Sequence, residues 1–195
     1  MDPYHVTATI LFCDIRNFTP LIEGAEAIDA VRFANEVVSR LGKEVEKNYG
    51  RIDHFTGDGF MAHFGISDSS RKHALDACRA AMDLRVCLNK INVHRYLQVE
   101  EVINIGVGIH TGTVAVGEIS TEEFRQKTIL GDAVNTTARI EDLTKFFNVD
   151  ILMTHATYEH LNDEILVKKM PLKKLKGKKH EVLTYWLLPT NLNYE

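Results

Sequence analysis

Apolar residues near the start of the chain follow first a strand pattern and then a helix pattern. Val6 to Cys13 is almost continuously apolar and rich in β-branched residues, which predicts a buried strand ending at Asp14. Farther on, apolar residues recur at intervals of three and four, as on one helix face, at Ile28, Val31, Ala34, Val38, Leu41 and Val45. This helix is expected to end near Asn48, with Gly50 as its C-cap.

The next segment predicts a hairpin and a second helix. Arg51 to Phe64 holds two short apolar runs around Thr56-Gly57-Asp58-Gly59, and an Asp-Gly pair between such runs is typical of a hairpin turn. Ser69-Ser70 can cap the helix that follows it. The apolar positions of this second helix are Ala74, Ala77, Ala81, Leu84 and Leu88.

A second hairpin and a last group of elements complete the pattern. Val102 to His110 alternates apolar and polar residues, and Thr111-Gly112 is expected to turn this strand into Thr113 to Val116. The remaining elements are a helix from Asp132 to Phe147, a strand from Asp150 to Thr154 and a C-terminal strand from Glu181 to Leu187.

This order of elements predicts the fold class. Strand, helix, hairpin, helix, hairpin is typical of an α+β sandwich in which helices cover one face of an antiparallel sheet. We therefore expect a ferredoxin-like core with C-terminal strand and helix additions. A chain of 195 residues with 45% apolar content can bury one core, so residues 1–195 are expected to form a single domain with its core at about 6–187. The first strand begins almost at once after Met1, as in a chain cut from a longer, regulated protein.

Composition narrows the classes of function. The net charge of −4 argues against a general nucleic-acid binder, which needs an excess of Lys and Arg. No apolar stretch approaches the ~20 residues of a membrane span, and no signal peptide opens the chain. Cys13, Cys78 and Cys87 cannot all pair, so reduced thiols and a cytoplasmic location are expected. Cys and His lack zinc-finger spacing, so any metal would be held by carboxylates.

Two aspartates at predicted strand ends are candidates for such a site. Asp14 and Asp58 would lie side by side if the first strand occupied the sheet centre next to the first hairpin. Mg²⁺ takes oxygen ligands and neutralises charge on a transferring phosphoryl group, which gives the two carboxylates a reason to converge. Taken singly, each is better explained as an ordinary aspartate, Asp14 at a cap or strand end and Asp58 in a turn.

Four segments in one order carry a specific resemblance: ILFCDIRNFT, IDHFTGDGFMAHFG, IGVGIHTG and ILGDAVNTTARIE. From about Val6 to Leu187 the chain resembles class III adenylyl and guanylyl cyclases. The resemblance implies the class III nucleotide cyclase fold and conversion of a nucleoside triphosphate into a 3′,5′-cyclic monophosphate and pyrophosphate. Diguanylate cyclases and polymerases also place two metal-binding carboxylates at a strand end and a hairpin, but their motifs are absent here.

The resemblance also implies a metal and phosphate site. Asp14 and Asp58 would ligate two divalent ions, Mg²⁺ or Mn²⁺, with the backbone carbonyl of Ile15 as a further ligand. Phe18 and Thr19 would lie at a helix start whose free N–H groups receive the triphosphate. The electrostatics of helix ends favours that arrangement independently of the family.

A second set of implied residues lies farther along the chain. Asn135 and Arg139 are four residues apart, on one face of the expected helix. By resemblance Asn135 positions the ribose, and Arg139 stabilises charge on the α-phosphate as the 3′-hydroxyl attacks. The alternative is a solvated helix face with Arg139 paired to Glu141 or to another nearby acid. In the lysine-rich segment, Lys176 best matches the lysine that reaches the β- and γ-phosphates, with Lys178 as the fallback.

Two positions bear on the base. Adenylyl cyclases of this class usually carry lysine at the place of His54 and aspartate or threonine at that of Thr128, whereas guanylyl cyclases usually carry glutamate and cysteine. Thr128 fits an adenylyl variant, and His54 departs from both patterns. We expect ATP, with His54 donating to adenine N1 and Thr128 accepting from N6. GTP is the alternative substrate, and an ordinary strand histidine is the alternative for His54.

Assembly follows from the same resemblance. In the resembled family the metal aspartates and the Asn135/Arg139 pair face each other across a subunit interface. Because this chain carries both sets, a head-to-tail homodimer with two composite active sites is implied. A cyclase-like regulatory partner without activity, the nonenzymatic alternative, would lack one of these residues. Threonine at position 128 resembles a subgroup that often responds to bicarbonate, but the sequence names no sensor.

Overall fold

The computed structural model describes residues 2–24, 26–68, 72–121, 125–161, 165–177 and 180–189. The strands are β1 (Tyr4–Arg16), β2 (Arg51–Phe55), β3 (Gly59–Phe64), β4 (Asn104–Ser120), β5 (Arg125–Leu130), β6 (Ile151–Thr154), β7 (Val167–Lys169), β8 (Lys173–Lys174), β9 (Glu181–Val182) and β10 (Thr184–Leu187). The helices are α1 (Phe18–Ile22), α2 (Ala27–Lys47), α3 (His73–Leu97), α4 (Asp132–Phe147) and α5 (His155–Tyr158).

One sheet dominates the molecule. Its strands lie in the order β2-β3-β1-β4-β6-β10-β7, with β5 paired to β4, while β8 and β9 form a separate pair. The pairs are antiparallel except β4 with β6, which run parallel because α4 carries the chain back across the sheet between them. The predicted α+β class is therefore confirmed, with one parallel pair added to the antiparallel core.

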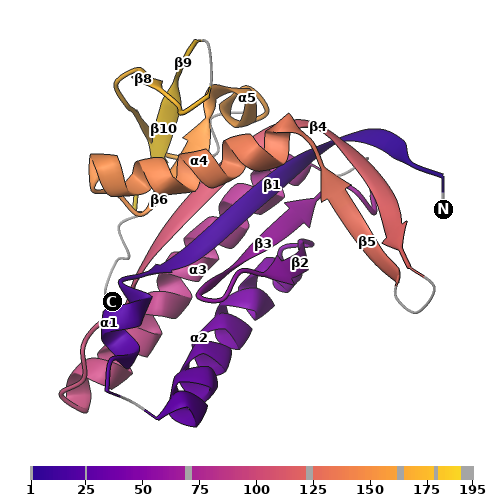
Figure 1. Ribbon diagram of the computed structural model, residues 1–195. Helices are drawn as coiled ribbons and strands as arrows, with labels where there is room; N and C mark the ends of the chain where they lie inside the picture. The colour runs from indigo at the N-terminus through magenta and orange to yellow at the C-terminus, as the bar shows by residue number, and fades with distance from the viewer. Residues whose placement is uncertain are drawn as a thin grey trace.

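Alternation along the central strands creates two covered faces rather than one. On β1, Leu11, Cys13 and Ile15 join the core packed against α2 and α3, whereas Ala8 and Ile10 join a second cluster on the other face. Figure 1 shows α2 and α3 side by side on one side of the sheet and α4 crossing the other. The prediction that helices cover one face was wrong, because successive apolar residues of β1 bury both of its faces.

The predicted turn at Thr111-Gly112 is also wrong. β4 continues through it from Asn104 to Ser120 and forms its hairpin with β5. The glycines of β4 serve a different purpose, because a Cβ at Gly108 would overlap the backbone of Glu141 and Thr137 on α4. Because glycine has no side chain, α4 can pack directly on β4. The rules that predict turns from sequence do not take such packing into account.

Element ends differ from prediction in three further places. β1 runs past Asp14 to Arg16. α2 ends at Lys47, and the left-handed position after it is Tyr49 (φ 64°) rather than Gly50. The expected C-terminal strand is divided into β9 and β10.

Two expected helices can be compared with the structure. The helix at Asp132–Phe147 is confirmed as α4. The second expected helix is α3, which begins at His73. Ser69-Ser70, its expected cap, lies outside the described residues.

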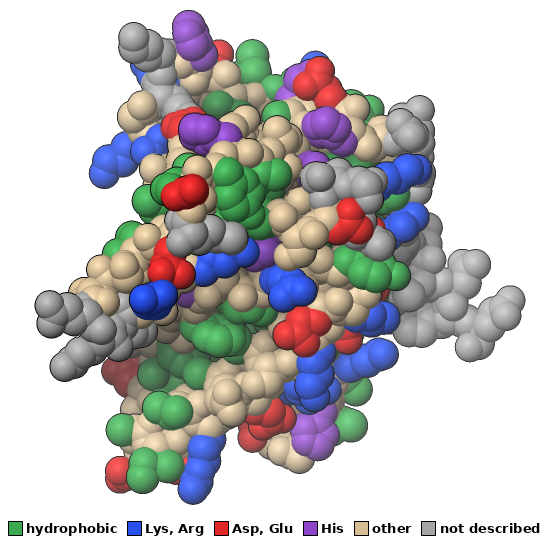
Figure 2. Space-filling model, turned by 90° about the vertical axis from the view of Figure 1, so that its right-hand side faces the viewer, with side chains coloured by type: hydrophobic (Ala, Val, Ile, Leu, Met, Phe, Trp, Pro, Cys, Tyr) green, Lys and Arg blue, Asp and Glu red, His purple; other side chains and the backbone are tan. Residues whose placement is uncertain are grey.

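The cysteines in the core and the charged side chains on the surface are arranged as the composition indicated. Cys13, Cys78 and Cys87 are free and buried. Basic and acidic side chains are interspersed on the face drawn in Figure 2, so that face offers no broad single-sign surface for a polyanion. Within the described ranges, none of the helices has the length and apolarity needed to cross a membrane.

Candidate active site

The β1–β3 pairing brings the two candidate metal aspartates together. Asp14 lies opposite Gly59, and the backbone N–H of Ile15 donates to the carbonyl oxygen of Asp58 at 2.9 Å. A Cβ at Gly59 would overlap the carbonyl oxygen of Cys13, so glycine is needed for this close approach. Burial and the adjacent Asp58 carboxylate raise the pKa of Asp14 to about 6. Two acidic groups therefore share one site without full compensation of charge.

A large cavity opens beside this pair. It has a volume of about 1150 Å³, and its walls include five of the residues singled out from the sequence: Asp14, Ile15, Phe18, Thr19 and Asp58. Arg85, Lys145 and Asp150 line it as well. This volume is slightly larger than the roughly 300–1,000 Å³ of typical small-molecule sites, and the lining combines acidic, basic and apolar groups.

The donor set fits divalent cations. Carboxylate and carbonyl oxygens are the ligands that Mg²⁺ prefers, and Mg²⁺ commonly keeps only one or two carboxylates and fills its other positions with water and substrate phosphates. Among the residues described here, no cluster of three or more His, Cys, Asp or Glu is placed to hold a metal by itself. Asp14 and Asp58, with the Ile15 carbonyl, are therefore suited to an ion that also binds a phosphate ligand.

A single helical turn borders the cavity. Asn17 adopts a left-handed conformation (φ 53°), which turns the chain from β1 into α1 beside Asp14. The ring of Phe18 stacks on Phe33 of α2 with centroids 6.2 Å apart, so Phe18 holds α1 against α2. Thr19 is exposed at the cavity. The start of α1 lies where the sequence analysis expected a helix start, although a helix of five residues has only a small dipole.

The C-terminal half of α4 supplies charged groups that the sequence analysis missed. Lys145 Nζ lies 3.6 Å from Asp14 Oδ2 and 3.5 Å from Asp142 Oδ1. Glu141 is buried against Gly106, and burial raises its pKa to about 7. Helical spacing could have indicated a Lys145–Glu141 pair, but nothing local indicates the contact with Asp14, which lies far away in sequence.

The other predicted α4 residues lie apart from the cavity. Asn135 is exposed, Arg139 is half-buried, and neither is among the residues lining the cavity. A Cβ at Gly177 would lie 3.5 Å from Arg139 Nη2, so the guanidinium adjoins the loop that carries the exposed Lys176. The structure thus places Arg139 beside the loop that carries Lys176, at Gly177, whereas Lys178 lies outside the described residues.

The alternative partner of Arg139 is not supported. Glu141 faces Gly106 and approaches Lys145 at 4.0 Å, on another side of the helix. Arg139 therefore keeps its position beside the Lys176 loop without this carboxylate.

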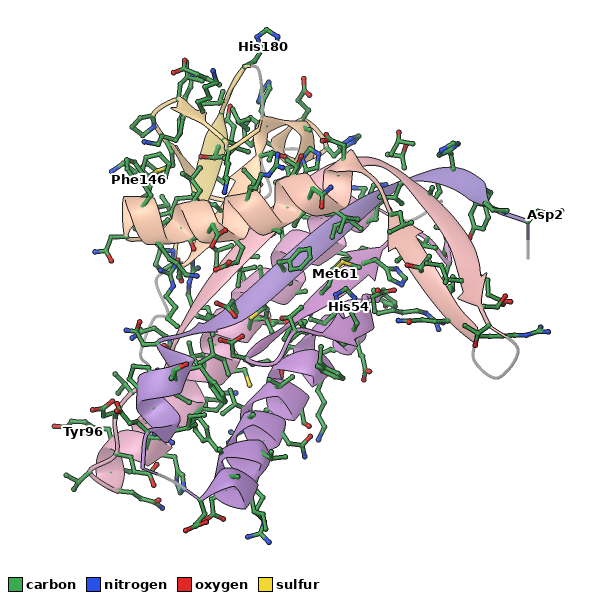
Figure 3. The ribbon with its side chains drawn as sticks, viewed as in Figure 1. Asp2, His54, Met61, Tyr96, Phe146 and His180 are labelled. Carbon is green, nitrogen blue, oxygen red and sulfur yellow. The ribbon has the colours of Figure 1, made fainter. Side chains whose placement is uncertain are left out.

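The two candidate base-reading residues lie on β2 and β5. His54 lies on the edge strand β2 and pairs with Met61 of β3, beside which Figure 3 shows it, and its side chain is 43% exposed. Its Nδ1 lies 2.8 Å from Asp53 Oδ2. Thr128 is half-buried and faces Gly117 of β4 across the ladder. Neither His54 nor Thr128 lines the cavity around Asp14.

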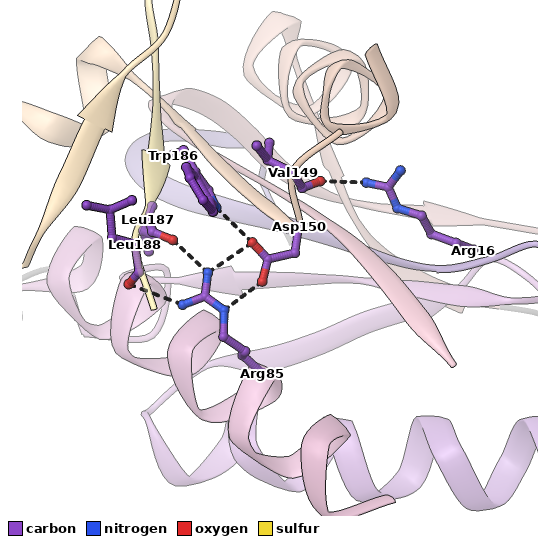
Figure 4. Close-up of polar contacts among 7 residues, drawn as sticks. All are labelled: Arg16, Arg85, Val149, Asp150, Trp186, Leu187 and Leu188. Carbon is purple, nitrogen blue, oxygen red and sulfur yellow. Dashed lines mark hydrogen bonds and ion pairs between the residues drawn. The ribbon is translucent and has the colours of Figure 1, made fainter. Parts of the chain in front are cut away.

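A polar network fixes the wall of the cavity at the last strand. Arg85 of α3 binds Asp150 through two bonds, Nε to Oδ2 at 2.6 Å and Nη2 to Oδ1 at 3.0 Å. It also donates to the carbonyl oxygens of Leu187 and Leu188, while Trp186 Nε1 donates to Asp150 (Figure 4). This bidentate arrangement ties β10 to α3 and to the start of β6.

Comparison with known proteins decides the family. The model of the adenylate and guanylate cyclase catalytic domain matches residues 2–189. The chain belongs to this family. It is 38% identical over 158 residues to an adenylate cyclase of Anabaena cylindrica, an alignment that covers 79% of this chain and 30% of that protein. The chain spans less than a third of the length of the first curated relatives it matches.

Solved cyclase domains share the fold over its whole length. The adenylyl cyclase CyaB from P. aeruginosa superposes with a TM-score of 0.89 at 26% identity, covering 100% of both chains. The guanylyl cyclase Cya2 gives a TM-score of 0.88 at 28% identity, covering 100% of this chain and 98% of the other. The class III cyclase fold expected from the sequence is therefore confirmed, and both base specificities occur among similar structures.

Proposed function

We propose that this cyclase domain converts ATP into 3′,5′-cyclic AMP and pyrophosphate as the catalytic part of a longer adenylyl cyclase. The observation that carries the proposal is the Asp14–Asp58 pair at a cavity of about 1150 Å³ in a chain of the cyclase family. The raised pKa of Asp14 is typical of acidic groups gathered for function rather than for stability.

In this proposal Asp14, Asp58 and the Ile15 carbonyl hold two divalent ions, Mg²⁺ or Mn²⁺. Ions held there would neutralise charge on the triphosphate and would favour ionisation of the ribose 3′-hydroxyl. The 3′-oxygen forms a bond to the α-phosphorus as the bond to the pyrophosphate oxygen breaks, and the hydroxyl proton passes to water. Phe18 and Thr19 supply backbone N–H groups to the phosphates.

The second residue set acts on the sugar and the leaving group. Asn135 orients the ribose, Arg139 stabilises charge on the α-phosphate, and Lys176 binds the β- and γ-phosphates. The proximity of Arg139 to Gly177 supports their joint action on one triphosphate. Because this set lies away from the Asp14 cavity, we assign the two sets of each active site to different subunits of a head-to-tail homodimer.

Base choice falls to His54 and Thr128. In the proposed adenylyl activity His54 donates to adenine N1, and Thr128 accepts from N6. GTP is the second candidate substrate because an imidazole can also accept a hydrogen bond from guanine N1, and the similar structures include a guanylyl cyclase.

The test measures cyclic AMP and cyclic GMP formed from ATP and GTP with Mg²⁺ or Mn²⁺. The native chain and Asp58→Ala are compared over a range of protein concentrations, with Asp29→Ala as a control because Asp29 is exposed on α2. We expect cyclic AMP formation that rises more than linearly with protein and falls at least ~100-fold in Asp58→Ala only. Preference for GTP would overturn the base assignment, and no product at any concentration would favour a regulatory partner.

A further inference from the structure

A β-bulge in β2 gives His54 an unusual neighbour. Ile52 pairs with Ala62 and His54 pairs with Met61, so Asp53 is an extra residue without a partner of its own on β3. Adjacent residues of a regular strand point to opposite faces, whereas a bulge re-aims them. Here it turns Asp53 and His54 toward each other, with Asp53 Oδ2 2.8 Å from His54 Nδ1.

This contact determines which nitrogen of His54 carries a proton. An aspartate carboxylate at neutral pH only accepts hydrogen bonds, so Nδ1–H of His54 must be the donor. Nε2 is then the nitrogen left to meet a ligand. It offers a lone pair when the ring is neutral and an N–H when the ring is charged. The Asp53 side chain is only 13% exposed, so water competes little for its oxygens.

We propose that Asp53 is a positioning residue for base selection, which makes His54 a donor suited to adenine when its ring is charged and an acceptor suited to guanine when its ring is neutral. Adenine N1 is an acceptor, and guanine N1–H is a donor. The inference rests on the proposed function, in which His54 meets the base. It explains how histidine can act at a position where adenylyl cyclases of this class usually carry lysine.

Other charged groups near this pair do not account for a pH effect between pH 6 and 9. Burial lowers the pKa of His63 on β3 to about 4, with Lys127 of β5 and Arg51 of β2 adding to the effect and Asp53 opposing it. His63 is therefore neutral across this range, and lysine and arginine side chains keep their charge.

The kinetic test is the ratio of kcat/KM for ATP to kcat/KM for GTP, measured from pH 6 to 9. Both substrates use the same metal site, so titration of that site changes both kcat/KM values equally and cancels in their ratio. In the native chain we expect it to fall at least ~10-fold as pH rises, because the charge-assisted hydrogen bond to adenine N1 is lost while a neutral hydrogen bond from guanine N1–H is gained. In Asp53→Ala a neutral ring can carry its proton on Nε2, so the change should be less than ~3-fold. His54→Lys, a fixed donor, should hold the ratio constant.

A second measurement does not need activity. Long-range ¹H–¹⁵N NMR of the native chain, with the His54 signals identified by their loss in His54→Lys, reports which nitrogen is protonated at pH 9. We expect the proton on Nδ1 in the native chain and on either nitrogen in Asp53→Ala. A constant native ratio, an equal slope in Asp53→Ala, or a proton on native Nε2 would each overturn the inference while leaving the cyclase assignment intact. Absence of both products would instead remove the proposed function, and the inference with it.

Discussion

The surroundings of Asp14 in the folded chain disfavour its charged form. Its pKa is raised from 3.8 to about 6, mainly by burial and then by Asp58, and Lys145 offsets only part of this. For an acid with a raised pKa in the folded chain, ionisation favours unfolding. The contribution of Asp14 to stability therefore decreases as pH rises from about 4 to 6 and stays unfavourable above that range.

Replacing Asp14 by Asn should therefore stabilise the metal-free chain. With EDTA at pH 7.5 we expect the free energy of unfolding of Asp14→Asn to rise by about 1 kcal/mol, a value reduced for solvent screening of a partly exposed group. Urea titration followed by Trp186 fluorescence measures it. Mn²⁺ should then stabilise the native chain more than the variant.

Asp29→Asn is the matched control, because Asp29 is exposed and paired only with the exposed Arg32 in the described structure. Its unfolding free energy should change by less than ~0.5 kcal/mol. If Asp14→Asn and the native chain were equally stable in EDTA, at pH 7.5 and at pH 4.5, the destabilisation assigned to the charged form of Asp14 would be contradicted.

At the scale of elements, the contact between α4 and β4 positions most of the second residue set. Gly108 has no side chain because the backbone of α4 occupies the space. Gly108→Ala should destabilise the chain by about 2–4 kcal/mol and displace α4, since the obstacle is backbone and cannot rotate away. Because α4 carries Arg139 and Asn135, its displacement should also lower cyclase activity, even under conditions in which the variant remains folded.

Gly117→Ala on the same strand is the control for that substitution. Its Cβ would meet Pro3 side-chain atoms at 3.6 Å, an ordinary contact, so stability should change by less than ~1 kcal/mol. Thermal unfolding and product formation are measured for both variants. Similar losses in the two would show that β4 tolerates no added side chain at either glycine position, rather than that α4 sets the limit at Gly108.

The elements also show how local sequence rules fail. α4 was predicted with its observed bounds, Asp132–Phe147. The false turn at Thr111-Gly112 and the unpredicted bulge at Asp53 come from tertiary demands. A glycine selected for helix packing resembles a glycine selected for a turn, and register against β3 is invisible in the sequence of β2 alone.

At the scale of the whole molecule, the proposed site needs two chains. Asp58→Ala and Arg139→Ala should each be inactive, yet a mixture should recover about one quarter of native activity. Half of randomly mixed dimers are then heterodimers, each with one of its two sites intact. The measurement is cyclic nucleotide formed by purified variants alone and mixed at equal concentration.

A mixture of Asp58→Ala with Asp14→Ala is the control for this complementation. Both changes remove ligands from the same half of the site, so the mixture should stay inactive. Recovery in the control, or no recovery with Arg139→Ala, would contradict the assignment of the two sets to different subunits.

The sequence by itself determined the family, the α+β class and the identity of the candidate residues, because four ordered segments and two periodicities are local properties. Only the tertiary structure decided that Asp14 and Asp58 share one cavity, that Lys145 joins them and that Asp53 faces His54. These contacts depend on strand register and on how closely α4 approaches β4, which are set by packing between segments far apart along the chain.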